Sequence, residues 1–309
     1  MDYVLETFDL SKRYNSQWAL KDVNMHVAKG DVYGFVGENG SGKTTVIRLV
    51  TGLIFPTKGH SALFGVRDDD PAILAQRRRV GAIVESPSIY MNMSAADNLR
   101  LQCSVLGIKE GIEEKVQKTL EVVGLSDLYE SKKLAGNFSL GMRQRLGIGM
   151  ALIGEPELII LDEPMNGLDP AGIVEVRELI IKLNREREIT FLISSHILSE
   201  LALVATKYGI ISKGVLVKEI TTSELLRECR ASVLIESKNT SELISLVKST
   251  FSPDDYTQTT SGVKVYGDID LNALLGKIIS AGISLDSVVC SRMGIEEYYL
   301  SLIGGKVND

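Results

Sequence analysis

The sequence predicts an α/β fold with a mostly parallel core sheet, a helical insertion in that sheet domain, and a small α+β appendage at the C-terminal end. Unbroken apolar runs such as LIILD (158–162) are typical of strands that are covered on both faces of a parallel sheet. Between such runs, apolar residues recur at helical spacing, as in the stripe formed by Val46, Leu49, Val50 and Leu53. Strands that alternate with helices in this way predict a largely parallel sheet.

Strand-like runs recur along the first two thirds of the chain. A second helical stripe, formed by Leu146, Met150 and Ile153, lies between two of them. The predicted strands of this part are YVLETFDL near the start, VNMHVA (23–28), DVYGFVG (31–37), VGAIV (80–84), LIILD (158–162), TFLIS (190–194) and YGIIS (208–212).

Two segments depart from this alternation. From about residue 86 to residue 155 we expect a helical insertion, because helix formers dominate its first part and Ser94 with Asp97 resembles a capping box. After residue 220 we expect a second unit of split β-α-β type. Its predicted strands are ASVLIES, SGVKVYG and ISLDSVV, and its predicted helices are SELISLVKST and DLNALLGKII. The expected domains are residues 1–220 and 221–309, and the second could regulate a dimer, extend its interface or stabilise the fold.

Composition and charge narrow the function classes. The chain has 309 residues, a net charge of -6, 44% hydrophobic residues and 24% charged residues, which describes an ordinary globular protein. The negative charge argues against nucleic acid as the main partner, and no run approaches the roughly 18 to 20 apolar residues of a spanning helix. The N-terminal MDYVLETFDL is unlike a signal peptide. Three dispersed cysteines without a CxxC pair argue against thiolate metal binding and favour a reducing cytosol.

The segment GENGSGKT (37–44) matches the phosphate-binding loop pattern G-x-x-x-x-G-K-[S/T], and it follows a buried strand and opens a helix. Glycines allow successive backbone N–H groups to curl around phosphates, and the helix N-terminus adds its positive end. We expect Lys43 to reach the β- and γ-phosphates and Thr44 to bind Mg²⁺ through its hydroxyl. A simple turn would explain the glycines but not Gly-Lys-Thr at this spacing. The predicted ATP-binding residues here are Gly37, Glu38, Asn39, Gly40, Ser41, Gly42, Lys43, Thr44 and Thr45.

The segment LIILDEP (158–164) supplies the acidic residues that such a site needs. A buried strand ends in Asp162, which is placed to bind the water shell of Mg²⁺, and Glu163 follows it. A second carboxylate beside the γ-phosphate can polarise the attacking water as a general base. Carboxylates often end strands, so this segment predicts a site only in combination with the phosphate loop.

Six motifs in order resemble those of the ATP-binding subunit of an ABC transporter, over roughly residues 3 to 220. They are Tyr14 in KRYNSQWAL, GENGSGKT, the signature FSLGMRQR (138–145), LIILDEP, the D-loop NGLDP (166–170) with Asp169, and ISSH (193–196) with His196. The resemblance implies a P-loop NTPase of ABC type with an antiparallel β subdomain, and an ATPase that uses ATP and Mg²⁺. It also implies that Tyr14 stacks on adenine and that His196 contacts the γ-phosphate beside the catalytic Glu163. Taken singly, Tyr14 fits a core or edge aromatic better, and His196 fits a structural histidine.

The signature segment departs from the family pattern LSGGQ. The resemblance implies that Ser139 and Gly141 bind the γ-phosphate of the opposite subunit, with Leu140 directed away from the nucleotide. Met142 cannot make the polar contacts of the family's glutamine on the ribose side. Because this segment acts on the nucleotide of a second copy, the resemblance implies a head-to-tail dimer. It further implies separate transmembrane permease subunits, and a position in the cytoplasm against the inner face of a bacterial cell membrane.

Glu85 ends the strand VGAIV at a position where the family carries a glutamine that reaches Mg²⁺ and the attacking water. On its own it reads as the first solvated residue after a strand. A glutamate here, with SLGMRQR and the C-terminal appendage, resembles the branch that serves lantibiotic self-immunity and bacitracin export. Glu85 is therefore a candidate Mg²⁺ ligand beside Thr44 and Asp162. We hypothesise that it ties closure of the site to Mg²⁺ and to the partner's position more than to the hydrolysis step.

The stretch SPSIYMNM directly after Glu85 carries Ile89, Tyr90, Met91 and Met93. Methionine and aromatic side chains are frequent at adaptable binding surfaces, although here they could also pack the helical insertion onto the sheet. The resemblance favours a groove that receives a cytoplasmic helix of the membrane subunit.

Three functions remain to be weighed against one another. The leading hypothesis is ATP hydrolysis that powers export of a peptide antibiotic. The alternative is a non-transport relative that acts as a clamp in DNA repair or translation, but the chain lacks the long coiled-coil insertion, zinc cysteines or second ATPase unit of such relatives. A third is a regulatory module in which ATP is only a switch, which the general base Glu163 argues against.

Overall fold

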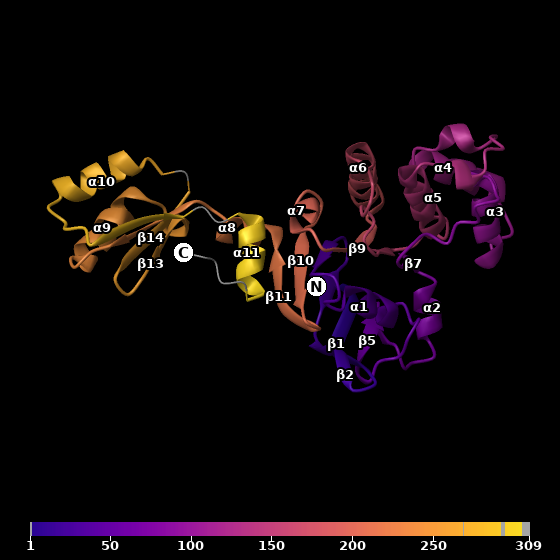
Figure 1. Ribbon diagram of the computed structural model, residues 1–309, viewed down its shortest axis with the longest axis horizontal. Coiled ribbons are helices and arrows are strands. Elements are labelled where there is room, and N and C mark those ends of the chain that lie inside the picture. Colours follow the sequence, from indigo (N-terminus) through magenta and orange to yellow (C-terminus); the bar gives the residue numbers. More distant parts are fainter. Residues whose placement is uncertain (1, 268, 292–293, 305–309) are drawn as a thin grey trace. The chain divides into compact units, whose positions relative to one another are not determined.

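The computed structural model describes residues 2–267, 269–291 and 294–304, and the chain forms two compact units, Met1–Thr222 and Ser223–Asp309 (Figure 1). The boundary that the sequence predicts after residue 220 falls within β11 (Val215–Thr221), the last strand of the first unit. Within the described ranges, no helix is long and apolar enough to cross a membrane.

The first unit is built around a six-stranded sheet in the order β11-β10-β4-β9-β8-β7. All pairs from β10 to β7 are parallel, and β11 runs antiparallel at one edge. Every residue of β4, β8 and β9 is buried, as their unbroken apolar sequences predict. The predicted mostly parallel core sheet is therefore confirmed. Its other strands are β4 (Val32–Val36), β7 (Val80–Ile83), β8 (Leu158–Leu161), β9 (Thr190–Ser195) and β10 (Lys207–Ser212).

Helix α1 (Lys43–Val50) follows β4 and buries Val46, Leu49 and Val50, three members of the predicted stripe. The fourth member was predicted wrongly, because Leu53 lies beyond the helix and is 64% exposed. The reason is Gly52, which takes a φ of 77° and ends the helix in a left-handed turn, with its N–H donating to the Leu49 carbonyl. The helices α6 (Pro170–Arg187) and α7 (Leu198–Leu201) also pack on the core sheet, while α2 (Ile73–Arg77) contacts β5 and β6 of the antiparallel sheet described next.

A second sheet in the first unit has the strand order β2-β1-β5-β6, with β3 also paired to β1, and all its pairs are antiparallel. This confirms the expected antiparallel β subdomain. The single strand predicted over 23–28 is interrupted, and the Thr7 hydroxyl satisfies the break by donating to the Val23 carbonyl and accepting from the Met25 N–H. The strands are β1 (Tyr3–Tyr14), β2 (Gln17–Val23), β3 (His26–Ala28), β5 (Lys58–Leu63) and β6 (Val66–Arg67).

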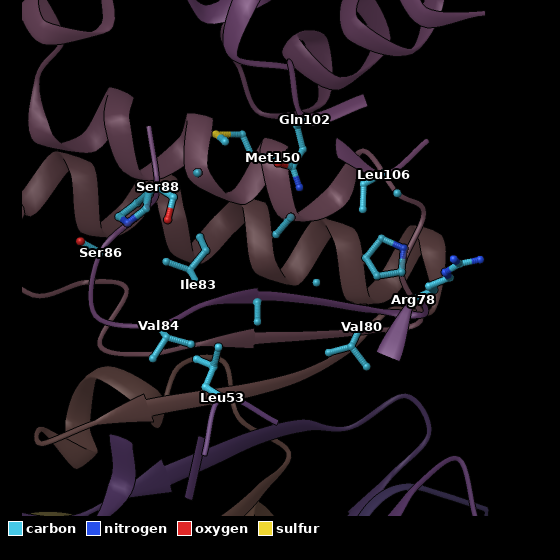
Figure 2. A pocket seen from close by; sticks show the side chains of 17 residues that line it. Leu53, Arg78, Val80, Ile83, Val84, Ser86, Ser88, Gln102, Leu106 and Met150 are labelled. Carbon is cyan, nitrogen blue, oxygen red and sulfur yellow. The ribbon is translucent and has the colours of Figure 1, made fainter. Parts of the chain in front are cut away.

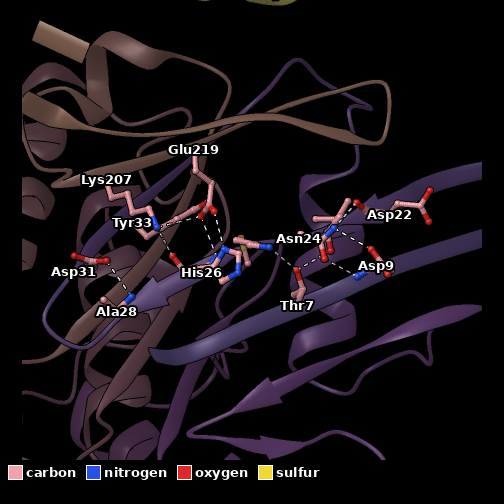
Figure 3. A network of polar contacts seen from close by, with 12 residues as sticks. Thr7, Asp9, Asp22, Asn24, His26, Ala28, Asp31, Tyr33, Lys207 and Glu219 are labelled. Carbon is pink, nitrogen blue, oxygen red and sulfur yellow. Dashed lines mark hydrogen bonds and ion pairs between the residues drawn. The ribbon is translucent and has the colours of Figure 1, made fainter. Parts of the chain in front are cut away.

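Figure 3 shows a polar network that joins the two sheets of the first unit. Glu219 on β11 accepts hydrogen bonds from the His26 ring at 2.8 Å and the Tyr33 hydroxyl at 2.9 Å, and Lys207 Nζ lies 3.3 Å from the same carboxylate. Burial raises the pKa of Glu219, but these partners outweigh burial and leave its pKa below the usual range. Burial and the adjacent carboxylate raise the pKa of the Tyr33 hydroxyl. The network fixes β3 against the core sheet.

The helices α3, α4 and α5 gather at one side of the first unit and form the predicted insertion (Figure 1). Ser94 is the N-cap of α3, and its hydroxyl accepts from the Asp97 N–H at 3.1 Å and donates to the Asp97 carboxylate at 2.7 Å. The helical segments are α3 (Ala95–Val105), α4 (Ile112–Val122), η1 (Ser126–Leu128), η2 (Ala135–Asn137) and α5 (Leu140–Leu152).

The second unit contains an antiparallel sheet in the order β13-β14-β12-β15, which is the split β-α-β arrangement that the sequence predicts. Apolar residues of β12 and β14 pack with α9 and α10 in its core, including Val233, Val263, Leu243 and Leu274. Both predicted helices and the strands predicted at ASVLIES and SGVKVYG are present, whereas the strand predicted over ISLDSVV begins later, at Ser287, and the three-residue strand β13 was not predicted. The elements are α8 (Thr222–Glu228), β12 (Ser232–Glu236), α9 (Thr240–Thr250), η3 (Pro253–Asp255), β13 (Tyr256–Gln258), β14 (Gly262–Tyr266), α10 (Leu271–Ser280), β15 (Ser287–Ser291) and α11 (Ile295–Leu302).

Candidate nucleotide-binding site

The parallel strands of the core sheet deliver the predicted site residues to one edge. Because β4, β7, β8 and β9 run in the same direction, their carboxyl ends share that edge. The phosphate loop follows β4, Asp162 and Glu163 follow β8, His196 follows β9, and Glu85 lies just beyond β7. The sheet topology therefore places four separate sequence segments beside one another.

The phosphate loop wraps closely around the start of α1. Gly40 and Gly42 take φ values of 80° and 112°, in the left-handed region that side chains disfavour. A Cβ atom on Gly37 would lie 2.5 Å from the Ile211 carbonyl oxygen, so a larger residue would displace the loop. Among the described residues, the buried Ser41 hydroxyl has no hydrogen-bond partner. A bound phosphate or its metal ion would supply that partner, which fits the predicted role of the loop.

Lys43 is almost fully buried at the centre of this loop. Its Nζ donates to the Gly37 carbonyl at 2.6 Å and to the Glu38 carbonyl at 3.3 Å, and it lies 3.2 Å from Glu163 Oε1. The ammonium group is thus held between the loop backbone and the Glu163 carboxylate. A phosphate that entered the loop would meet a cation already directed toward it.

Asp162 and Thr44 form the corner that would hold Mg²⁺. The Thr44 hydroxyl donates to Asp162 Oδ2 at 2.9 Å, and Asp162 is only 4% exposed. Mg²⁺ in nucleotide sites takes one or two carboxylates and completes its shell with phosphate oxygens and waters. One aspartate and one hydroxyl suit that need. The part of the chain that the structure describes has no group of three or more His, Cys, Asp or Glu side chains that could form an all-protein cage.

Ser194 is a site residue that the sequence did not single out. Its hydroxyl donates to Asp162 Oδ1 at 2.5 Å and accepts from the Glu163 N–H at 2.9 Å. Ser194 therefore orients both acidic residues from the neighbouring strand. The signal lay in TFLISSH, where a polar residue interrupts a buried strand one position before its end. The next residue, Ser195, accepts from the Ile197 N–H at 3.0 Å and so serves the turn that follows β9.

Glu163 is held from two sides. The His196 ring donates through Nδ1 to Glu163 Oε2 at 2.8 Å, and Lys43 approaches the other carboxylate oxygen. Glu163 has a φ of 49°, a left-handed conformation that is uncommon for a residue with a side chain. Strained backbone of this kind concentrates at functional sites. The structure thus brings together Lys43, Thr44, Asp162, Glu163 and His196, as the predicted catalytic arrangement requires.

Glu85 lies at the same edge but makes a different contact. Its carboxylate forms an ion pair with Arg48 on α1, rather than with Thr44 or Asp162. The side chain is 62% exposed, and the residue has a φ of 64°. Arg48 was not predicted as part of the site, because no sequence pattern connects it with a residue 37 positions later. The proposed metal role of Glu85 remains a prediction.

Tyr14 ends β1, and its ring is 45% exposed with Lys12 Nζ at 5.3 Å from the ring centroid. An exposed aromatic face is what stacking on a base requires. Trp18 on the paired strand β2 is also exposed, and the guanidinium of Arg13 lies 5.4 Å from its ring. Trp18 is a neighbour of the expected adenine site that the sequence did not single out.

The signature segment and the D-loop both begin helices. Ser139 is the N-cap of α5 and accepts from the Met142 N–H at 3.2 Å, while Asp169 caps α6 and accepts from the Gly172 N–H at 3.1 Å. Leu140 is exposed and Gly141 is buried. Among the described residues, no hydrogen bond or ion pair joins Ser139 to Lys43 or Asp162. A role of this segment on the nucleotide of a second copy stays a prediction.

A groove of about 430 Å³ opens beside β7, between that edge strand and α5 (Figure 2). Its walls include Val84, Ser86 and Pro87 from the loop after β7, Leu53 beyond α1, and Met150 on α5. Tyr90 and Met91, which the sequence predicts at a partner groove, are exposed outside this lining, while Ile89 and Met93 are half-buried. The Asn98 side chain bonds both the N–H and the carbonyl of Tyr90, so the backbone there is fixed while the side chains of Tyr90 and Met91 remain accessible.

Comparisons with known proteins identify the family of the chain. A family profile described as "ABC transporter" matches residues 20–166. The Bacillus licheniformis protein named bacitracin transport ATP-binding protein BcrA is 42% identical over 309 residues, which covers 99% of each chain. The Streptococcus pyogenes protein named lantibiotic transport ATP-binding protein SrtF is 43% identical over 227 residues, covering 73% of this chain and 95% of that protein.

The fold is also similar to a solved structure. The cbiO1 protein from Clostridium perfringens, described as part of the ABC transporter complex cbiONQ, superposes with a TM-score of 0.67 and 26% sequence identity. The match covers 74% of this chain and 92% of cbiO1. The predicted α/β fold of a P-loop NTPase of ABC type is thereby confirmed for the first unit.

Proposed function

The chain belongs to the ATP-binding subunits of ABC transporters, and from this premise we propose that it powers the export of a bacitracin-like or lantibiotic peptide through a separate membrane subunit. Members of this family bind and hydrolyse ATP, so the chain is an ATPase. The observation that carries the proposed cargo is the 42% identity to a bacitracin transport protein over the full length, C-terminal unit included. Nothing found favours a clamp in DNA repair or translation.

The contacts of the phosphate-loop edge support the following division of roles. Thr44 and Asp162 hold Mg²⁺, which neutralises phosphate charge when bound. Lys43 exchanges Glu163 for phosphate oxygens as the nucleotide enters, and this exchange leaves the carboxylate free to act on water. Glu163 takes a proton from the attacking water while the oxygen of that water bonds to the γ-phosphorus. The bond between the γ-phosphorus and the bridging oxygen breaks, and ADP leaves with that oxygen. His196 keeps the carboxylate oriented and reaches the γ-phosphate.

The complete enzyme in this proposal is a head-to-tail dimer. Ser139, Gly141 and Met142 approach the nucleotide of the second copy, and Asp169 lies at the interface beside them. The exposed position of Ser139 and Leu140 at the start of α5 supports this, since the segment is accessible to a partner. The groove beside β7, with the exposed Tyr90 and Met91 next to it, is the proposed seat of the membrane subunit. This arrangement places the chain in the cytoplasm, against the inner face of a bacterial membrane.

The test compares the wild type with Glu163→Gln. We expect Mg²⁺-dependent phosphate release from the wild type, and a stable ATP-bound dimer of the variant by size-exclusion chromatography. The matched control is Glu157→Gln, an exposed glutamate that pairs with Arg79 away from the site. If the wild type neither hydrolyses ATP nor dimerises with its membrane subunit present, the proposed mechanism is wrong.

The cargo needs a separate experiment. The chain and its membrane subunit, expressed together in a sensitive bacterium, should raise the bacitracin or lantibiotic concentration that inhibits growth. Glu163→Gln should abolish this protection. Charged substitutions at Tyr90 and Met91 should abolish protection as well, but leave ATP binding by the isolated protein unchanged. An active ATPase that protects against neither class of peptide would contradict the proposed cargo.

A further inference from the structure

The loop after β7 faces two sites at once. Val84, Ser86 and Pro87 line the groove beside the edge strand (Figure 2). Glu85, which lies between them in the sequence, instead directs its carboxylate to Arg48 on α1. A displacement of this loop therefore changes both the wall of the groove and the position of one carboxylate.

Helix α1 connects the same two sites from the other side. Arg48 follows Thr44 by four residues, so the two side chains lie on one face of the helix, one turn apart. Thr44 bonds Asp162 in the corner that fits Mg²⁺, and Leu53, just beyond the helix, lines the groove. The ion pair thus ties Glu85 to the helix that also carries the metal-site hydroxyl of Thr44.

The backbone at Glu85 is strained. The Ser86 N–H donates to the Val84 carbonyl at 2.8 Å, which closes a three-residue turn around Glu85 with a φ of 64°. Turns of this kind with positive φ are rare, and strained conformations persist only where surrounding contacts hold them. The ion pair with Arg48 is a contact that holds this one.

We propose that Arg48 is a positioning residue that retains Glu85 on α1 and competes with Mg²⁺ for its carboxylate. This inference rests on the proposed Mg²⁺ corner at Thr44 and Asp162. The pair is readily exchanged, because the Arg48 and Glu85 side chains are 38% and 62% exposed and exposed ion pairs are weak.

The first arm of the test uses the protein without nucleotide. Hydrogen exchange is measured for the amides of residues 84–86 and 88 in the wild type, Arg48→Ala and Arg67→Ala. Arg67 is the matched control, since it forms another exposed ion pair, with Asp69, on the antiparallel sheet. We expect exchange about two- to fivefold faster in Arg48→Ala alone, the scale of an exposed ion pair. Equal exchange in Arg48→Ala and Arg67→Ala would overturn the proposal, whatever the nucleotide site does.

The second arm measures competition with Mg²⁺ directly. In the Glu163→Gln background, the Mg²⁺ concentration that gives half of the ATP-bound dimer should fall about two- to fivefold on Arg48→Ala. Arg48→Lys keeps the charge and should give an intermediate value. A midpoint that is unchanged or raised in Arg48→Ala contradicts the competition. If the parent forms no dimer with its membrane subunit present, the proposed dimer mechanism is wrong, and the exchange arm decides on Arg48 by itself.

Discussion

Two strand ends at one edge of the core sheet hold a glutamate in opposite ways. Both Glu163 and Glu85 have left-handed backbone, with φ values of 49° and 64°. The Glu163 carboxylate lies between Lys43 and His196, and the backbone N–H of Glu163 donates to the hydroxyl of the buried Ser194. The Glu85 carboxylate is mostly exposed and pairs with one arginine.

The difference shows how one sheet edge can combine a fixed group with a movable one. The Glu163 side chain is only 21% exposed and contacts both Lys43 and His196, whereas an exposed pair such as that of Glu85 with Arg48 contributes about 0–1 kcal/mol. Glu163 is thus fixed where a general base must be, and Glu85 can change partners at little cost. Substitutions at the two strand ends should therefore differ in how far they lower turnover.

The largest effect is expected at the fixed glutamate. Glu163→Gln keeps the shape of the side chain but cannot take a proton, so turnover should fall about 10²- to 10⁴-fold. The measurement is phosphate release at saturating ATP and Mg²⁺. A loss below about tenfold would mean that another group accepts the proton, and the contrast with Glu85 would disappear.

A smaller effect is expected at Ser194, which fixes the same strand end without touching substrate. Ser194→Ala removes the donor to Asp162 and leaves the Glu163 N–H without its acceptor. An unsatisfied buried polar group costs about 1–3 kcal/mol, and turnover should fall roughly 5- to 150-fold if that cost is borne by the active arrangement. Thermal unfolding and phosphate release should both be measured beside Ser195→Ala, which affects only the turn after β9. Equal losses in the two variants would show that Ser194 does not orient the acidic pair.

The fold could be predicted where a short stretch of sequence carries the pattern of a strand, helix or turn. The buried strands β4, β8 and β9 each carry an unbroken apolar run, and GENGSGKT identifies the strand-to-helix turn by its glycines. The end of α1 was missed because helical spacing continues to Leu53 while Gly52 stops the helix. The strand β13 was missed because a strand of three residues is too short to show a periodic pattern.

The site could be predicted only for residues that directly follow a strand recognisable from its apolar run. Asp162, Glu163 and His196 each follow an apolar run, so parallel topology alone places them together. Ser194 and Arg48 carry no such mark, since the first lies inside a buried strand and the second on an ordinary helix. Their partners are determined by tertiary packing, since Ser194 and Asp162 are 32 positions apart in the sequence and Arg48 and Glu85 are 37 positions apart.

The next prediction tests the movable glutamate. Glu85→Gln loses the charge that would attract Mg²⁺ but retains a side chain able to reach it, so turnover at saturating Mg²⁺ should fall by less than about tenfold, the discrimination expected of one exposed charge. The Mg²⁺ concentration for half-maximal turnover should rise instead. A titration of ATPase activity with Mg²⁺ gives both numbers. A fall as large as that of Glu163→Gln would place Glu85 in the hydrolysis step and remove the distinction between the two strand ends.

The smallest effect on turnover is expected at Glu219, whose carboxylate contacts His26, Tyr33 and Lys207 in the network away from the phosphate loop (Figure 3). Its folded pKa is lowered, so its charged form stabilises the fold at pH values above the ordinary glutamate pKa of 4.5, and that contribution is lost as the pH falls below it. Glu219→Gln should lower Tm at pH 7, with the gap to the wild type narrowing below pH 4.5, while turnover stays unchanged.

The control for Glu219 is Glu121→Gln, since Glu121 is an exposed glutamate on α4, outside this network. Thermal unfolding by circular dichroism between pH 3.5 and pH 7.5 measures the gap for both variants. If Glu219→Gln lowered turnover as Ser194→Ala does, dense hydrogen bonding of a carboxylate would be enough to affect catalysis from a distance. If turnover is spared, the role of Glu163 follows from its place at the carboxyl ends of the parallel strands, because burial and partners alone do not make a glutamate catalytic.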